Sequence, residues 1–212
     1  LLAAADLDHG YQHDESHSIL SLLIGAGANP NSTNLKGQTM IHLLLSTDFY
    51  VWRRGQTIRD LIAAGADLEA RDSLGNTALL TAALNADIYC GSTDPLEVTH
   101  DCGAIYLTEY PVNLEAINRM NRSALMIASE NNSLSIVKNL LQKNVRLNQQ
   151  DQDGSTALIL AVKSGNIEIL EALLIARADV HLRDLNHQSA LDWAKNTNSE
   201  LAIKYLKFAG AM

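Results

Sequence analysis

Two stretches of the sequence carry side chains that could hold a metal ion. His9, His13 and His17 recur at every fourth position among acidic residues, and Cys90 and Cys102 flank a second stretch that also holds His and Asp. Imidazole, thiolate and carboxylate are the groups that ligate zinc. However, a glycine directly after the first His interrupts any helix that would gather the imidazoles, and the two cysteines fit no common zinc spacing. We therefore expect no metal and no cofactor; whether Cys90 and Cys102 are oxidised to a disulfide stays open.

Motifs for catalysis are missing from the sequence. It contains no glycine-rich phosphate loop, because its glycines recur at structural intervals, and it has neither a G-x-S-x-G nor an H-E-x-x-H motif. The carboxylates are dispersed along the chain, whereas a general acid and a general base must converge in one pocket. We expect that the chain is not an enzyme.

Charge and composition narrow the classes of partner. The 16 Lys and Arg against 24 Asp and Glu give a net charge of -8, which repels a phosphate backbone, so we expect no nucleic acid. No apolar run approaches the roughly 18 to 20 residues that a membrane span needs, so we expect no membrane association. Two cysteines are too few for a disulfide framework, which favours a reducing, cytoplasmic location.

A short signal recurs along the chain and predicts a repeat architecture. It reads GQTMI, GNTAL, NRSAL, GSTAL and HQSAL, starting at Gly37, Gly75, Asn121, Gly154 and His187, with spacings of 38, 46, 33 and 33 residues. A period between about 20 and 50 residues is typical of solenoids.

Each regular repeat is expected to hold two helices. An apolar stripe spaced i, i+3, i+6, i+7 predicts the second helix; its members are Leu134, Val137, Leu140 and Leu141, which recur as Ile167, Leu170, Leu173 and Leu174. Residues that tolerate a left-handed backbone follow the second helix: Gly27, Gly65, Asn144 and Gly210. The hydroxyl residues of the recurring signal are expected to cap the first helix: Thr39, Thr77, Ser123, Thr156 and Ser189.

Helix, turn, helix and an extended finger about every 33 residues resemble the ankyrin repeat, D-x-x-G-x-T-P-L-H-x-A followed by L-L-x-x-G-A-D-V-N-A. One repeat supplies Asp72, Gly75, Thr77, Leu79 and Ala82, and another supplies Leu61, Gly65, Ala66 and Asp67. The family's Pro is replaced in these repeats by Met or Ala, and its His survives only as His42. The resemblance implies an all-α repeat solenoid of about six helix-turn-helix units joined by extended β-fingers. It also implies that His42 is structural and bonds backbone groups near the fingers.

We expect a single ankyrin-repeat array over residues 1–212. The expected repeats are 1–34, 35–72, 73–118, 119–151, 152–184 and 185–212, the last as a C-terminal cap whose outer face is polar.

The resemblance implies that a partner protein is held by the finger tips and the first helices, on the concave face. Carried over to this sequence, the expected contact residues in the fingers are Leu35, Lys36, Leu74, Asn76, Arg119, Met120 and Arg122, with further variable positions at Gln38, Ser73, Gln152, Asp153, Ser155, Leu185, Asn186 and Gln188. The alternative is that Leu35, Leu74 and Leu185 pack one finger on the next.

Insertions between the first and second helices offer a second candidate surface. The second and third repeats carry 5 and 13 extra residues and the first about 7, which should form one edge of the stack. The insertion of the second repeat contains Tyr50, Trp52 and Arg53, residue types enriched at binding hot spots. The alternative is that its aromatic side chains fold back to cover the lengthened turn.

These patterns predict a protein-protein interaction module, a scaffold or adaptor whose partner is another protein. The alternative is a regulatory or substrate-recruiting segment of a larger enzyme, or a secreted bacterial effector delivered into a host cell. The Ala-for-Pro repeats and the many Asn and Gln residues are more typical of a bacterial ankyrin protein than of an animal one.

Overall fold

The structure, a computed structural model, describes residues 22–46, 54–85 and 103–211. The chain divides into two compact units, an N-terminal unit of residues 1–113 and a C-terminal unit of residues 114–212. Each is described by itself. Most of the insertions and the candidate zinc ligands lie outside the described residues.

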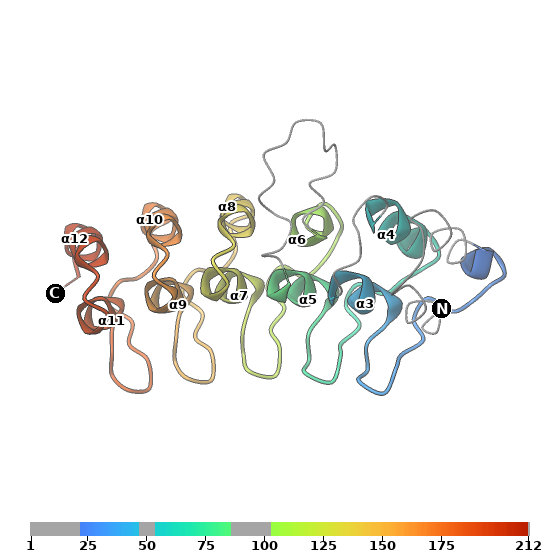
Figure 1. Cartoon of the computed structure of the whole chain (residues 1–212), viewed down its shortest axis with the longest axis horizontal. Helices are drawn as coiled ribbons and strands as arrows, with labels where there is room; N and C mark the ends of the chain where they lie inside the picture. The colour runs from blue at the N-terminus through green and yellow to red at the C-terminus, as the bar shows by residue number, and fades with distance from the viewer. Residues whose placement is uncertain (1–21, 47–53, 86–102, 212) are drawn as a thin grey trace. The chain divides into compact units, whose positions relative to one another are not determined.

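Helix pairs build the N-terminal unit, after a short helical stretch at residues 22–25. Its described helices are α3 (Met40–Ser46), α4 (Arg54–Ala63), α5 (Ala78–Leu84) and α6 (Gly103–Leu107). α3 packs against both α4 and α5, and α5 packs against α6. Thus α3 and α5 form one layer, α4 and α6 form a second, and extended hairpins project from the first layer (Figure 1).

The C-terminal unit repeats the same plan three times. Its helices are α7 (Ala124–Glu130), α8 (Leu134–Gln142), α9 (Ala157–Ser164), α10 (Ile167–Ile175), α11 (Ala190–Asn196) and α12 (Glu200–Phe208). α7, α9 and α11 lie side by side in one layer, and α8, α10 and α12 lie in a second (Figure 1). The expected helical solenoid is confirmed; in the described part of the chain, the extended connections form isolated β-bridges, such as that between Arg183 and Ser189, rather than strands. The repeat boundaries and the single array stay predictions.

The buried face of the second helices is rotated around the helix relative to the predicted stripe. The fully buried members are Ile136, Val137 and Leu140 in α8, and Ile169, Leu170 and Leu173 in α10. Four expected members are only half-buried: Leu134, Leu141, Ile167 and Leu174. The difference arises because α8 and α10 pack both against the first helix of their own repeat and against each other, so the contact surface extends around the helix.

Helix ends follow the predicted chemistry with two exceptions. Ser123, Thr156 and Ser189 accept hydrogen bonds from the first turns of their helices, as expected, but the hydroxyl of Thr77 makes no such bond. The backbone after the second helix is left-handed at all four expected positions. It is also left-handed at Arg177 (φ 67°), where a side chain makes that conformation strained.

His42 is a structural residue, as the resemblance implied. Its ring is fully buried, and Nδ1 accepts from the Thr39 N–H at 3.3 Å and lies 2.8 Å from the Thr39 hydroxyl. Because Nδ1 is an acceptor, Nε2 carries the proton and donates to the Asn76 carbonyl at 3.0 Å. The imidazole therefore ties the first helix of one repeat to the hairpin of the next.

Candidate functional site

One hydrogen-bonded turn builds each described hairpin tip. An Asp or Asn begins the turn, and its Oδ1 accepts from the backbone N–H groups two and four residues later, at 2.8 to 3.1 Å; the five residues are Asn34, Asp72, Asn118, Asp151 and Asp184. A left-handed residue occupies the fourth position, with φ between 58° and 80°. These side-chain bonds substitute for strand pairing and fix the tip in one conformation. The sequence signal for this turn is the Asp or Asn that recurs at its first position, and of these residues only Asp72 was part of the predicted repeat motif.

Neighbouring tips are joined through the backbone within each unit. The second residue of one turn donates its N–H to the carbonyl of the third residue in the preceding turn, in Ser73 to Lys36 (2.8 Å), Gln152 to Met120 (3.1 Å) and Leu185 to Asp153 (2.9 Å). At Gly154 a Cβ would lie 2.8 Å from the backbone nitrogen of the next tip, so glycine permits the close approach. The tips are therefore a rigid edge whose side chains project outward.

Apolar side chains at the tips are exposed. Leu35 is fully exposed, Leu74 is 63% exposed and Leu185 is 71% exposed, and Met120 is also on the surface. The alternative in which the three leucines pack one finger on the next is wrong, because all three side chains are largely exposed. Lys36 and Arg119 are exposed beside them. Five of the expected contact residues are thus accessible.

Two expected contact residues are engaged inside the fold. Asn76 is 2% exposed and its amide donates to Asp72 Oδ2 at 3.2 Å, so its side chain is removed from the candidate surface. Arg122 pairs with Glu130 at 2.5 Å and with Asp151 Oδ2 at 3.3 Å, and only 19% of its side chain is exposed. The insertion candidates Tyr50, Trp52 and Arg53 lie outside the described residues.

The second carboxylate oxygen explains why these side chains are engaged. In a turn that begins with Asp, Oδ1 makes the turn and Oδ2 needs its own donor. Asp72 Oδ2 accepts from Asn76, the fifth residue of the same hairpin. Asp151 Oδ2 accepts from Arg122, the fifth residue of the preceding hairpin. At Asn34 the side chain is an amide that donates to Gln38 Oε1 at 3.1 Å instead.

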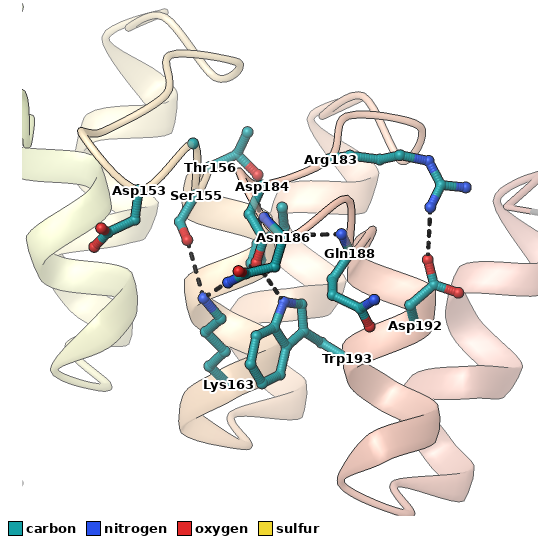
Figure 2. A network of polar contacts seen from close by, with 12 residues as sticks. Asp153, Ser155, Thr156, Lys163, Arg183, Asp184, Asn186, Gln188, Asp192 and Trp193 are labelled. Atoms are coloured by element: carbon teal, nitrogen blue, oxygen red, sulfur yellow. Dashed lines mark hydrogen bonds and ion pairs between the residues drawn. The ribbon is translucent and has the colours of Figure 1, made fainter.

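The last hairpin has the most extensive network, shown in Figure 2. Asp184 Oδ2 accepts from the Trp193 indole N–H at 2.8 Å and lies 3.6 Å from the Lys163 ammonium. Lys163 also donates to the Ser155 hydroxyl at 3.0 Å and lies over the Trp193 ring, 4.3 Å from its centre. Sequence reasoning missed Lys163 and Trp193, because it considered fingers and not the first-helix positions that face them.

Two carboxylates in this network have a lowered pKa. Burial alone would raise the pKa of Asp184, but hydrogen bonds from the Gln188 N–H, the Trp193 indole and the Asn186 N–H, together with Lys163, outweigh it and lower the pKa. The pKa of Asp192 is lowered chiefly by the hydroxyl and N–H of Ser189, with Arg183 2.9 Å away contributing. Both groups are therefore held as carboxylates that stabilise the fold.

The chemistry of these groups favours recognition. The side chains that link this network bond to structural partners: Lys163 donates to the Ser155 hydroxyl, the Trp193 indole to Asp184, and Arg183 to Asp192. Over the part of the chain that is described, no cluster of three His, Cys, Asp or Glu is placed to bind a metal ion. Across the same ranges, no helix has the length and apolar character needed to cross a bilayer.

The chain is similar to a known ankyrin-repeat family and to solved ankyrin-repeat structures. The family described as ankyrin repeats (3 copies) matches residues 99–184 and 125–211. Human B-cell lymphoma 3 protein is 33% identical over 184 residues, which cover 84% of this chain and 37% of that protein. The crystal structure of the ankyrin repeat domain of Bcl-3, a member of the IkappaB protein family, aligns with a TM-score of 0.72 and 31% identity over 90% of this chain and 77% of that one. An ankyrin repeat domain from Acinetobacter baumannii aligns over 100% of this chain and 97% of that one with a TM-score of 0.77, at 22% identity.

Proposed function

This chain belongs to the ankyrin-repeat family, and from that membership we propose that it is a protein-binding module whose contact surfaces are the hairpin tips of each unit. The observation that carries the proposal is the exposure of Leu35 and Leu74 on tips whose backbone is fixed by hydrogen bonds. A rigid surface loses little conformational freedom when it binds, so contact with exposed apolar groups translates efficiently into affinity.

Each unit contributes a different set of tip side chains. The N-terminal unit offers Leu35, Lys36 and Leu74, and the C-terminal unit offers Arg119 and Met120 as its counterparts. Within each unit an apolar and a basic side chain are neighbours on one tip, Leu35 with Lys36 and Met120 with Arg119, and this pairing suits a partner surface that is both apolar and acidic. The 31 to 33% identity to Bcl-3 supports a protein partner. Because the chain spans 37% of the length of human Bcl-3, nothing of that protein's wider activity is carried over.

The inserted turns are the second part of the proposal. Tyr50, Trp52 and Arg53 are residue types enriched at binding hot spots, and they belong to an insertion that a compact repeat does not require. The cytoplasmic location, the bacterial origin and the role as a segment of a larger enzyme or effector stay predictions.

The test is a comparison of bound proteins among matched variants. Wild type, Leu35→Ser/Leu74→Ser, Trp52→Ala/Arg53→Ala and the control Leu22→Ser would each be used for affinity purification with quantitative mass spectrometry. We expect one specific protein to be lost with the Leu35→Ser/Leu74→Ser pair and retained with the control, whose exposed apolar residue lies outside the tips. Binding of the purified partner by calorimetry then measures the loss. Loss with the Trp52→Ala/Arg53→Ala pair alone would move the site to the insertion, and retention by both pairs would reject the proposal.

A further inference from the structure

The second layer of the C-terminal unit exposes large apolar side chains on its last two helices. Phe208, the final residue of α12, is 93% exposed, and Ile175, the final residue of α10, is 77% exposed. They are 33 residues apart and so occupy the same position in consecutive repeats. The equivalent residue of α8 is Gln142, which is also exposed. In this unit the position is therefore apolar in α10 and α12 but polar in α8, so the repeat fold does not require an apolar residue there.

A third exposed apolar residue lies on the same face of α12. Leu201 is 57% exposed and precedes Phe208 by seven residues, or two turns, and Tyr205 lies between them half-buried. Positions i, i+4 and i+7 share one face of a helix, and the buried Ala202 and Leu206 lie on the adjoining face. α10 packs directly against α12, so Ile175 extends this face sideways. We call these residues, Ile175, Leu201, Tyr205 and Phe208, the α12 patch. The polar outer face expected for the C-terminal cap stays a prediction.

The charges around the α12 patch are mainly positive. Lys204 and Lys207 are exposed on α12, and neither has a hydrogen-bonding or ion-pair partner among the described residues. The left-handed Arg177 stands two residues after Ile175. Glu171 on α10 and Glu200 at the start of α12 are the acidic groups on these two helices nearest the patch in sequence.

This balance differs from that of the chain as a whole. Residues 114–212 hold eleven Lys and Arg against ten Asp and Glu, whereas residues 1–113 hold five against fourteen. Unpaired lysines beside exposed aromatic and aliphatic groups are complementary to a partner that is both apolar and acidic.

We propose that the α12 patch is a docking site for an acidic amphipathic helix of a partner protein, separate from the hairpin tips. The spacing of Leu201 and Phe208 matches the two-turn repeat of a helix laid along α12, whose apolar seam would cover them. Acidic side chains flanking that seam would reach Lys204 and Lys207. A lipid surface is less suited to this site, because membrane adsorption through charge takes clusters of about four to eight basic residues.

A peptide-display selection followed by affinity measurement tests the charge and the place of binding. The library would hold helical peptides of about 18 residues, roughly five turns, with leucine fixed along one face and Glu, Lys or Ser varied at the flanking positions. We expect the wild-type chain to enrich peptides with Glu at these positions. For the best peptide, Phe208→Ala should weaken binding at least about tenfold, as substitution at a buried aromatic contact does. Lys204→Glu/Lys207→Glu should weaken peptide binding more at low salt than at high salt, because salt screens the charges.

Matched variants separate the α12 patch from other sites. Gln142→Ala changes the same repeat position in α8 and should leave peptide affinity unchanged, as should the tip variant Leu35→Ser/Leu74→Ser. Because Phe208 is exposed, Phe208→Ala should retain the wild-type circular dichroism spectrum and unfolding midpoint. Enrichment of basic or neutral peptides, no enrichment, or loss of binding in the tip variant would overturn the proposal. The proposal would also be overturned if the wild-type chain formed a dimer in sedimentation velocity, or adsorbed to phosphatidylserine vesicles, and Phe208→Ala abolished that association.

Discussion

Replacing Leu173 by alanine should destabilise the C-terminal unit strongly. Leu173 is fully buried in α10, a helix that packs against α8, α9 and α12. The substitution removes three methyl- or methylene-sized groups, which at ~0.8 kcal/mol each amounts to about 2.4 kcal/mol of lost burial. The cavity that remains adds up to about another 2 kcal/mol, because neighbours on three helices cannot all collapse into it. We expect the free energy of unfolding to fall by about 2.5 to 4.5 kcal/mol.

Urea denaturation followed by circular dichroism measures this change, and the next residue provides the matched control. Leu174 belongs to the stripe predicted from sequence but is only half-buried, so Leu174→Ala should cost about 1 kcal/mol. A larger loss for Leu174→Ala than for Leu173→Ala would refute the register of α10. A loss below about 1 kcal/mol for Leu173→Ala would refute the packing of that layer.

Three further variants test local features of the fold. Thr81→Val should raise the free energy of unfolding by about 1 kcal/mol in urea denaturation, because the Thr81 hydroxyl is buried without a hydrogen-bond partner; a decrease would mean that the hydroxyl is bonded. Arg177→Gly should raise it by roughly 0.5 kcal/mol by relieving the left-handed strain, measured against Gly65→Ala, which should lower it. Asp184→Asn should make the free energy of unfolding depend less on pH in acid. The folded pKa of Asp184 is below its ordinary value, so its contribution to stability is complete above the ordinary value and is lost as pH falls through the folded one. An unchanged slope of unfolding free energy below pH 4 would contradict the assignment.

The periodicity of the sequence predicted the scaffold because burial depends on local spacing. Each repeat must bury one face of two short helices, and the residues that do so recur at a fixed interval whatever their neighbours are. His42 was predicted from its motif for the same reason, since its partners Thr39 and the Asn76 backbone are set by the repeat. The left-handed positions followed from glycine and asparagine, whereas Arg177 carries no such mark.

Surface residues were predicted less well because their accessibility depends on side-chain contacts that the repeat pattern does not specify. Asn76 and Leu74 are two positions apart on one tip and look equally variable in sequence, yet one is buried and the other exposed. The difference follows from Asp72, whose second oxygen draws in the amide of Asn76. Exposure of Phe208 was missed because the last repeat was expected to be polar, an expectation that came from Lys207 beside it.

The first residue of each hairpin therefore determines which kind of side chain is engaged beside it. An Asp at this position needs two kinds of donor: backbone N–H groups for one oxygen and a side chain for the other, as Arg122 provides for Asp151 and Trp193 for Asp184. An Asn keeps the turn but presents an amide in place of the second oxygen, so at Asn34 the engaged partner is an acceptor, Gln38 Oε1, and not a donor. The choice between Asp and Asn, which is conservative for the turn, thus changes the residues that the tip can offer. It gives a repeat protein a way to alter its binding surface while its buried positions stay the same.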